Sequence, residues 1–358
     1  MNIEARLTRL RTLLAENIVD AVLITKEENV RYFSGFCGDS AVLLVTAERL
    51  ILVTDRRYTE QAAAEAPLYE VVEQRDGLYG KAAELAVDAG VVSLAFEGGA
   101  LVYIKVIWLR ERLGEISFDT PLNLDPLRQV KDADEVALIR RACAIADAGF
   151  AHIIDYIEPG MTELEVAAEL EHHMRMLGSE RPAFPTIIAS GIRGSLPHGV
   201  ASDKLIARGE LVTMDFGAVC GGYHSDITRT ICVGHADARQ RDIYDAVLTA
   251  QQRALAALHP GVTGIEVDRI ARDSLAEQDL EKYFGHGLGH SLGLEIHEEP
   301  RLSKAGKDVL QPNMLITDEP GVYIPGWGGI RIEDTVLITA DGAEPLTHAP
   351  KELIEICI

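Results

Sequence analysis

Two pairs of carboxylates stand at matched distances from tight turns in the second half of the chain. Asp215 and Asp226 flank Cys220-Gly221-Gly222, between two apolar runs rich in β-branched residues, and this pattern predicts a β-hairpin. A turn centred between Cys220 and Gly221 would place the two carboxylates directly opposite each other, with Cβ atoms about 5 Å apart. Like charges destabilise a hairpin at that distance, so we expect cations between them. Two divalent ions about 3.5–4 Å apart would fit.

The same arrangement recurs downstream. Residues 315–338 are predicted to form a strand, a turn and a second strand, with Glu319 and Glu333 equidistant from Gly326. One such pair could arise by chance, whereas two pairs in one chain point to a single site built from four carboxylates. Burying even one unpaired charge is costly, so such a site requires compensating positive charge.

An imidazole is the candidate fifth ligand. Residues 284–300 hold His286, His290 and His297 among small residues that let the backbone and the rings approach a crowded site. An oxygen-rich donor set with one imidazole favours Mn²⁺, with Co²⁺ and Zn²⁺ also suited. Paired ions would generate hydroxide near neutral pH and polarise a carbonyl oxygen, so we predict hydrolysis of an amide.

An internal repeat explains why the carboxylate pairs come twice. Residues 158–166 recur as residues 259–267, 101 positions later, and each copy opens a helix with a Thr-x-x-Glu capping box. The carboxylate hairpins follow at nearly the same offset, 104 positions between Asp215 and Glu319. We therefore predict two copies of helix, helix and hairpin related by a pseudo-twofold axis, with all four carboxylates at the centre of one sheet.

The elements before this region predict a separate α/β domain without a catalytic constellation. Its strands are expected at residues 21–25, 41–46, 50–54, 69–73, 91–95 and 115–118, and its helices at 3–17, 57–66, 78–87 and 100–113. We place this domain at residues 1–122, an interdomain linker at 123–131 and the second domain, of α+β class, at 132–358, beginning with a long helix over 132–157.

Composition excludes several partners. The 358 residues carry a net charge of −22, and without a basic stripe we expect neither nucleic acid nor a membrane as a partner. The five cysteines are odd in number, widely spaced and never form CxxC, so neither a disulfide framework nor a thiolate zinc site is indicated. With no apolar run that approaches a membrane span and no signal sequence, we expect a cytoplasmic location.

These motifs together resemble those of the pita-bread metallopeptidases, most closely their Xaa-Pro branch of prolidases and aminopeptidases P. The resemblance rests on the spacing of Asp215 and Asp226, on Gly-His-Ser-Leu-Gly-Leu-Glu-Ile-His-Glu-Glu-Pro at 289–300, on Glu-Pro-Gly-Val-Tyr at 319–323 and on Gly-Gly-Ile-Arg-Ile-Glu-Asp-Thr at 328–335. It covers the whole chain and implies an α/β creatinase-like N-terminal domain followed by an α+β pita-bread domain with internal pseudo-twofold symmetry.

The resemblance also implies a role for each site residue. Asp215 would bind one of two metals, Asp226 and Glu333 would bridge both, and His290 and Glu319 would bind the other. Glu319 would also act as the acid and base, transferring a proton from water to the leaving nitrogen. The remaining implied residues are His198 and His297 at the substrate carbonyl and the tetrahedral intermediate, Arg331 beside the carboxylates, His286 at the edge of the site and Arg301 near the substrate carboxylate.

One residue departs from the family pattern, and three alternatives remain. Asp318 stands where relatives usually carry an apolar residue, which adds negative charge near the centre. Arg301 suits the free carboxylate of a dipeptide and favours a prolidase-type Xaa-Pro dipeptidase, but aminopeptidases P that act on longer peptides can share the local motif. A binding scaffold that lost the chemistry, or a creatinase-like hydrolase that needs no metal, should lack some of the ligands, and none is missing. Family relatives are commonly homodimers, which makes a homodimer the expected assembly.

Overall fold

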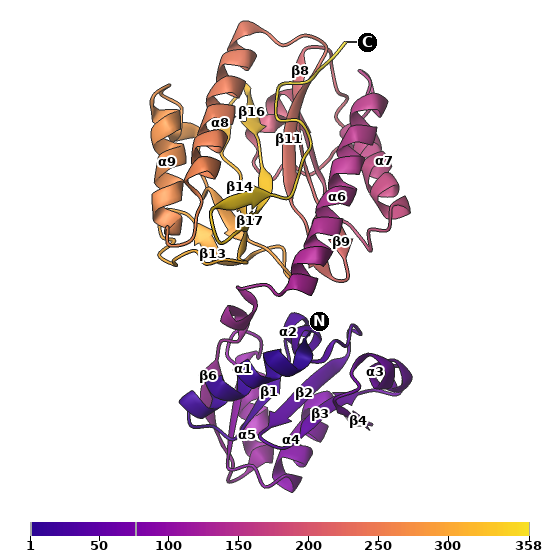
Figure 1. Cartoon of the computed structure of the whole chain (residues 1–358). Helices are drawn as coiled ribbons and strands as arrows, with labels where there is room; N and C mark the ends of the chain where they lie inside the picture. The colour runs from indigo at the N-terminus through magenta and orange to yellow at the C-terminus, as the bar shows by residue number, and fades with distance from the viewer. Residues whose placement is uncertain (1, 76, 358) are drawn as a thin grey trace. The chain divides into compact units, whose positions relative to one another are not determined.

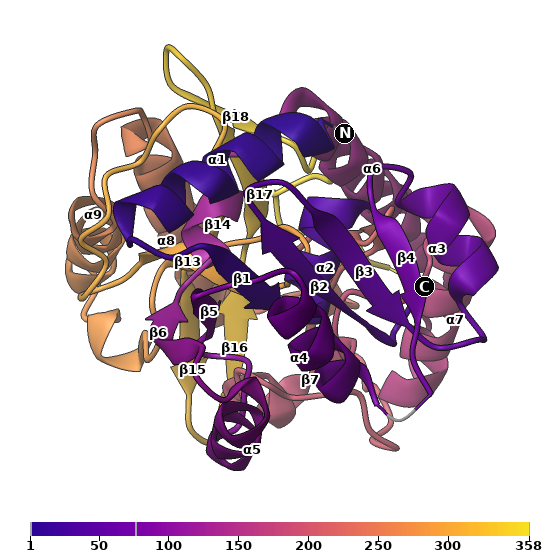
Figure 2. The same ribbon diagram turned by 90° about the horizontal axis from the view of Figure 1, so that it is seen from below.

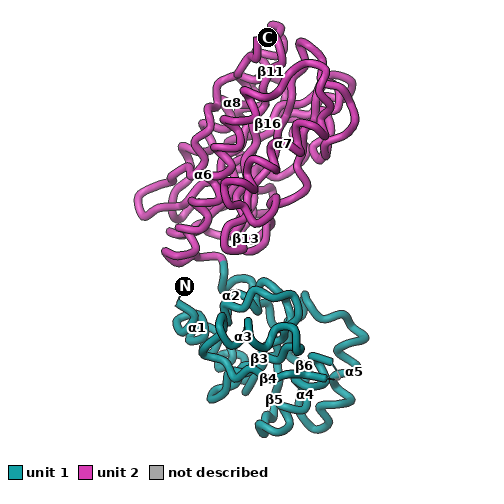
Figure 3. The backbone as a smooth tube through the Cα atoms, turned by 90° about the vertical axis from the view of Figure 1, so that its right-hand side faces the viewer, with its two compact units in different colours: residues 1–128 teal, residues 129–358 magenta. Residues whose placement is uncertain are grey.

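The chain folds into two compact units. The structure, a computed structural model, describes residues 2–75 and 77–357, and the units are Met1–Arg128 and Gln129–Ile358 (Figure 3). The boundary between them falls inside the segment 123–131 that was expected to link two domains. No helix in the described ranges is both long enough and apolar enough to cross a membrane.

The first unit is a six-stranded mixed sheet covered by helices, with strand order β4-β3-β2-β1-β5-β6. Apolar side chains of the sheet pack against α4 and α5, which lie side by side (Figure 2). The strands are β1 (Ala21–Ile24), β2 (Ala41–Thr46), β3 (Leu50–Thr54), β4 (Glu70–Glu73), β5 (Ser93–Glu97) and β6 (Ser117–Leu122), and the helices are α1 (Ile3–Glu16), α2 (Glu27–Ser34), α3 (Thr59–Glu65), α4 (Leu78–Asp88) and α5 (Tyr103–Leu113). A 3₁₀ turn, η1 (Asp125–Arg128), ends the unit.

Two features of this unit differ from the sequence-based expectation. Helix α2 was not predicted, because it is short and its N-cap residue, Lys26, makes no side-chain cap hydrogen bond that would mark a helix start. Strand β6 was predicted to end at 118 but continues to Leu122 through Pro121. The proline is tolerated because β6 is an edge strand, where one side of the backbone needs no ladder partner.

The second unit consists of two halves, and each half has two helices packed beside a group of strands. Helices α6 (Ala133–Tyr156) and α7 (Glu163–Met176) flank the strands on one side, and α8 (Ala238–Ala257) and α9 (Gly264–Ala276) on the other (Figure 1). The larger sheets have the orders β19-β11-β8-β7 and β13-β12-β14-β17-β18. Their strands are β7 (Ile187–Ser190), β8 (Glu210–Phe216), β11 (Ile227–Val233), β12 (Gly289–Ser291), β13 (Glu298–Leu302), β14 (Leu315–Asp318), β17 (Asp334–Ile338), β18 (Ala343–Pro345) and β19 (Glu355–Ile356). Two short ribbons complete the unit, β9 (Val219–Cys220) with β10 (Tyr223–His224) and β15 (Gly321–Ile324) with β16 (Gly328–Arg331).

The predicted repeat is visible in the hydrogen bonds of the two halves. Thr162 and Thr263 each cap a helix. The side chain of each threonine accepts a hydrogen bond from the backbone N–H of the glutamate three residues later, and that glutamate's side chain accepts one from the backbone N–H of the threonine. Gly160 N–H donates to the carbonyl of Ile206 at 2.8 Å, and Gly261 N–H donates to the carbonyl of Leu310 at 2.8 Å. The two segments related by the repeat thus form the same helix cap and the same backbone hydrogen bond to a later segment of their own half.

Two details of the predicted hairpins are wrong. Asp215 lies opposite Thr228 rather than Asp226, because the tight turn is made by Gly221 and Gly222, both at positive φ, and is centred one residue later than predicted. The four carboxylates also do not lie in one sheet, since β8 and β11 belong to one sheet and β14 and β17 to another. The second hairpin keeps the predicted register, with Asp318 opposite Asp334 and Gly321 opposite Arg331 on either side of Glu319 and Glu333.

Candidate metal centre

Every residue predicted for the site lines one cavity of about 730 Å³ in the second unit. The acidic members are Asp215, Asp226, Glu319 and Glu333, and the basic members are His198, His286, His290, His297, Arg301 and Arg331. Apolar side chains fill much of the remaining wall, namely Phe184, Pro185, Ile187, Pro197, Val200 and Ile296. The cavity therefore combines a charged centre with an apolar surround, which is typical of a small-molecule or peptide site.

Three carboxylates converge at the centre of the cavity. Asp215 stands on β8, Asp226 immediately before β11 and Glu333 immediately before β17, and one oxygen of each lies within 4.8 Å of the others. Asp215 Oδ1, Asp226 Oδ1 and Glu333 Oε1 are buried without a hydrogen-bond partner in the described structure. Orphaned, buried carboxylate oxygens are costly unless a cation binds them.

His290 and Glu319 complete the donor set from the second half of the unit. His290 Nε2 lies 3.6 Å from Asp226 Oδ2 and 3.4 Å from Glu319 Oε1. Its Nδ1 lies 3.0 Å from the carbonyl of Ser291, a contact in which Nδ1–H donates and the lone pair of Nε2 faces the carboxylates. Burial lowers the pKa of His290 to about 3, so the ring is neutral, as a metal ligand must be.

The carboxylates cannot all ionise without compensation. Burial raises the pKa of Asp226 and Glu333 well above their usual ranges, and the neighbouring carboxylates raise it further. Burial likewise raises the pKa of Glu319 to about 7. Four carboxylates, three of which have a buried oxygen without a hydrogen-bond partner in the described structure, and one neutral imidazole are the donors that hard or borderline divalent cations prefer, so the residues present fit a metal centre.

Two threonine hydroxyls that were not predicted from the sequence bond to carboxylates of the candidate site. Thr228 Oγ donates to Glu333 Oε2 at 2.6 Å, and Thr317 Oγ donates to Glu319 Oε1 at 3.0 Å. Thr317 lies two residues before Glu319 and Thr228 two after Asp226, and alternation along an extended chain places residues i and i+2 on one face. That spacing was the available signal for these threonines.

A polar chain links Arg331 to His286. Arg331 Nη2 donates to Asp215 Oδ2, Nε donates to Thr228 Oγ at 3.0 Å and Nη1 donates to the Tyr323 hydroxyl at 2.6 Å. The Tyr323 oxygen lies 2.8 Å from His286 Nε2. Arg331, predicted beside the carboxylates, and His286, predicted at the edge of the site, therefore belong to one network, joined by a tyrosine that was not predicted from the sequence.

The other predicted residues surround the centre. The His297 ring packs edge-on against His290, with ring centroids 4.5 Å apart, and burial lowers its pKa. Arg301 stands on β13, and its Nε lies 3.5 Å from Glu299 Oε1. His198 lies beyond a 3₁₀ turn, η2 (Gly191–Ser195), in the loop that leads to β8. These cationic or polar groups are placed to meet a polar substrate in the same cavity.

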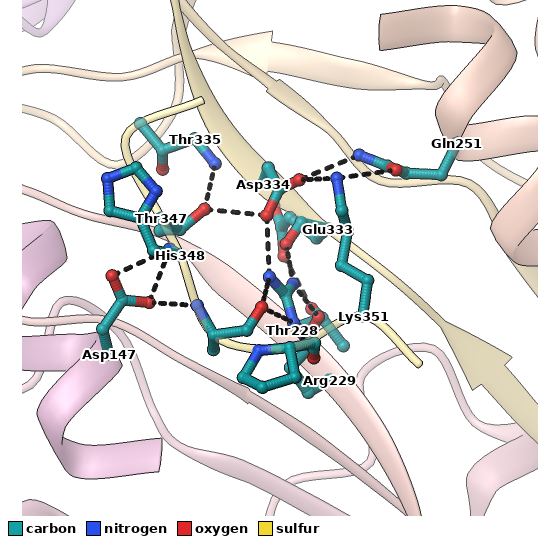
Figure 4. A network of polar contacts seen from close by, with 12 residues as sticks. Asp147, Thr228, Arg229, Gln251, Glu333, Asp334, Thr335, Thr347, His348 and Lys351 are labelled. Carbon is teal, nitrogen blue, oxygen red and sulfur yellow. Dashed lines mark hydrogen bonds and ion pairs between the residues drawn. The ribbon is translucent and has the colours of Figure 1, made fainter. Parts of the chain in front are cut away.

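A second network lies next to Glu333 (Figure 4). The buried Arg229 donates to the main-chain carbonyls of Thr228 and Glu333 and to Asp334 Oδ1, the last at 2.8 Å. Lys351 Nζ donates to Asp334 Oδ2 at 2.7 Å. Arg229 thereby ties β11, which follows Asp226, to the main chain of Glu333.

Asp318 is fully buried, and neither carboxylate oxygen has a hydrogen-bond partner in the described residues. Burial raises its pKa well above the usual range, and the nearby Asp334 raises it further. Extra negative charge was predicted here from the sequence. The raised pKa favours the neutral form instead.

Two family models match the chain. Metallopeptidase family M24 matches residues 137–340, and the creatinase/prolidase N-terminal domain matches residues 6–130. The M24 match contains every residue predicted for the site.

Named relatives resemble the chain over nearly its whole length. The Xaa-Pro dipeptidase of Pyrococcus furiosus is 44% identical over 353 residues, which cover 98% of this chain and 99% of that protein. The solved structure of an Xaa-Pro dipeptidase from Bacillus anthracis has a TM-score of 0.96 and 42% identity, and the match covers 99% of this chain and all of that one. An X-Pro aminopeptidase from Thermotoga maritima has a TM-score of 0.92 and 36% identity, covering 98% of this chain and 99% of that one.

Proposed function

The chain belongs to metallopeptidase family M24, and from this membership we propose that it is a prolidase-type Xaa-Pro dipeptidase. It would hydrolyse the bond between an N-terminal residue and a following proline. The observation that carries the proposal is a carboxylate and imidazole cage, with three orphaned oxygens, that shares its cavity with Arg301. The cage suits amide hydrolysis, and the arginine suits a free carboxylate.

Two divalent cations are the proposed cofactors, with Mn²⁺ best suited to the donors and Co²⁺ or Zn²⁺ as alternatives. Asp215, Asp226, His290, Glu319 and Glu333 would hold them. When bound, such ions polarise a carbonyl and lower the pKa of water toward neutrality.

The protein's own groups would move the proton and hold the substrate. Glu319 would take a proton from the attacking water and deliver it to the leaving nitrogen. His198 and His297 would donate to the substrate carbonyl and to the charge that develops on its oxygen. Arg331 keeps Asp215 in place, and His286 supports Arg331 through Tyr323.

Arg301 would select the substrate length. A dipeptide presents its carboxylate one residue beyond the cleaved bond, where a guanidinium can form two charge-assisted hydrogen bonds with it. The alternative is an Xaa-Pro aminopeptidase that acts on longer peptides. The similarity to the X-Pro aminopeptidase from Thermotoga maritima supports this second candidate.

We further propose a cytoplasmic homodimer that acts on proline-containing peptides. The five cysteines agree with a reducing compartment, since they are widely spaced and none of them forms a disulfide in the described structure.

The test compares hydrolysis of Ala-Pro and Ala-Pro-Ala by the metal-free protein after addition of Mn²⁺, Co²⁺ or Zn²⁺. The dipeptidase proposal expects turnover of Ala-Pro alone, and an Arg301→Met variant should raise KM for Ala-Pro by about tenfold or more, because a charge-assisted pair is lost. Turnover mainly of Ala-Pro-Ala would favour the aminopeptidase. A protein that binds metal but cleaves neither peptide would contradict the Xaa-Pro assignment, and one that binds no metal would favour a binding scaffold.

A further inference from the structure

Glu163 is a buried carboxylate with no place in the mechanism described above. It is the first residue of α7 and has no solvent exposure. Its two oxygens nevertheless accept hydrogen bonds from three other residues. The donors are Ser190 and Ser202, each through both its backbone N–H and its hydroxyl, and the Arg193 guanidinium.

These partners stand at the two ends of the loop that carries His198. Oε1 of Glu163 accepts from Ser190 N–H and Oγ, both at 2.8 Å, where β7 ends. Oε2 accepts from Ser202 N–H at 3.1 Å and from its Oγ at 2.7 Å, where the loop returns. One carboxylate thus joins the start and the end of residues 190–202.

Arg193 extends the clamp into the loop. Its Nη1 donates to Glu163, and its Nη2 donates to the carbonyl of Val200 at 2.8 Å, two residues after His198. Successive backbone bonds tighten the loop between these points, since Leu196 N–H donates to the carbonyl of Arg193 and Gly199 N–H donates to that of Leu196. The His198 ring has no hydrogen-bond partner of its own within the described ranges, so the loop backbone sets its position.

We propose that Glu163 and Arg193 are positioning residues that hold His198 toward the reacting carbonyl. The inference rests on the proposed function for the role of His198, but the clamp itself is independent of that role. Without the Glu163 carboxylate, the loop would lose its five hydrogen bonds to that side chain, and the His198 ring would leave its productive geometry. A displacement of about 1 Å far from the chemistry can lower a rate by about a hundredfold.

A double-mutant cycle tests the proposal with metal-loaded full-length protein and Ala-Pro as substrate. Glu163→Gln keeps the shape but loses the charge-assisted bonds, and we expect kcat/KM to fall between about tenfold and a hundredfold with metal content unchanged. In a His198→Ala background the same substitution should cost less than about twofold, because its effect acts through the histidine. Equal losses in both backgrounds would overturn the proposal. Arg193→Lys should reproduce the pattern if Glu163→Gln folds poorly.

Hydrogen exchange supplies a readout that needs no substrate. Glu163→Gln should speed exchange of the backbone amides of Leu196, Gly199 and Val200. The control is Glu165→Gln, which removes a negative charge from the same helix start but keeps a side-chain acceptor for the cap and removes no loop contact. Unchanged loop exchange in Glu163→Gln would contradict the clamp. If Glu163→Gln speeds exchange but the wild-type protein cleaves no Xaa-Pro peptide, the clamp is supported and only the proposed function is contradicted.

Discussion

The two halves of the second unit fix their substrate-facing segments by opposite means. In the first half, Glu163 opens α7 and binds the loop of His198 through its side chain. The position related by the repeat in the second half is Gly264, at the start of α9. There the main chain of Arg301 packs against the helix, and an ideal Cβ on Gly264 would lie 2.1 Å from the Arg301 carbonyl oxygen.

The comparison separates what the repeat keeps from what it changes. Helix caps, bridging hydrogen bonds and carboxylate hairpins recur in both halves, and the hairpins supply the four carboxylates of the candidate metal centre. The segments that follow the helices differ, since one carries a histidine on a clamped loop and the other carries Arg301 on a strand that contacts α9. The repeated hairpins can therefore place donors around the proposed cations. The segments that differ between the halves can contact the two unlike ends of a peptide.

The largest expected effect comes from Asp226 and Glu333, the two carboxylates expected to bridge the proposed cations, one from each half. Asp226→Asn and Glu333→Gln should each lower kcat/KM by at least about a thousandfold, because each would remove a charged donor to the proposed cations, which would supply several kcal/mol of catalysis. Kinetics and elemental analysis of bound metal check this, with the exposed Asp341→Asn as control. Full activity in one variant and none in the other would break the symmetric half of the comparison.

The second prediction concerns two carboxylates of the candidate metal centre, Asp215 and Glu319, which have different hydrogen-bond partners. Asp215 has the Arg331 guanidinium as partner, whereas Glu319 receives a hydrogen bond from the neutral Thr317. The pKa of Glu319 is raised from 4.5 to about 7, so its stabilising contribution is present below pH 4.5 and is lost as the pH rises to about 7.

A metal-free Glu319→Gln variant should therefore gain stability over the wild type across that pH range. The shift corresponds to about 3 kcal/mol by pH 7.5. Urea unfolding in the presence of a chelator, at intervals from pH 4.5 to 7.5, measures the difference. A difference between variant and wild type that does not change with pH would show that Glu319 is not held in a raised-pKa environment.

The residues of the candidate site could be predicted from the sequence because charge and spacing are local signals. Four carboxylates at matched distances from glycine turns and a repeated capping box could be read without coordinates, and the structure brings Asp215, Asp226 and Glu333 within 4.8 Å. The register of the first hairpin was mispredicted because three residues, Cys220 to Gly222, offered two centres for the turn. Glu163 was missed since a glutamate at a helix start is ordinarily solvated, and only the fold shows that distant serines surround it.

The third prediction tests a feature that only the second half has, the close packing of Gly264 against the main chain of Arg301. Gly264→Ala would force the Arg301 main chain away from α9, and we expect a loss of about 2 kcal/mol in the free energy of unfolding, as for overpacking. The KM for Ala-Pro should also rise, because Arg301 moves with its strand. Gly285→Ala is the matched control, since nothing lies within 4 Å of its added Cβ. Equal stability in the two variants would mean that the close packing is not required.

The smallest expected effect sharpens the comparison at the caps themselves. Thr162→Ala and Thr263→Ala each remove the acceptor of an equivalent backbone N–H, Glu165 in one half and Glu266 in the other. Both should cost about 1 kcal/mol of stability, measured by urea unfolding of metal-loaded protein. Their effects on catalysis should differ, because Thr162 precedes the clamp residue Glu163 whereas Thr263 precedes Gly264. A fall of kcat of about twofold to fivefold is expected only for Thr162→Ala, as a frayed helix start loosens the loop of His198. Equal kcat in the two variants, at equal loss of stability, would indicate that Glu163 holds the loop independently of its cap.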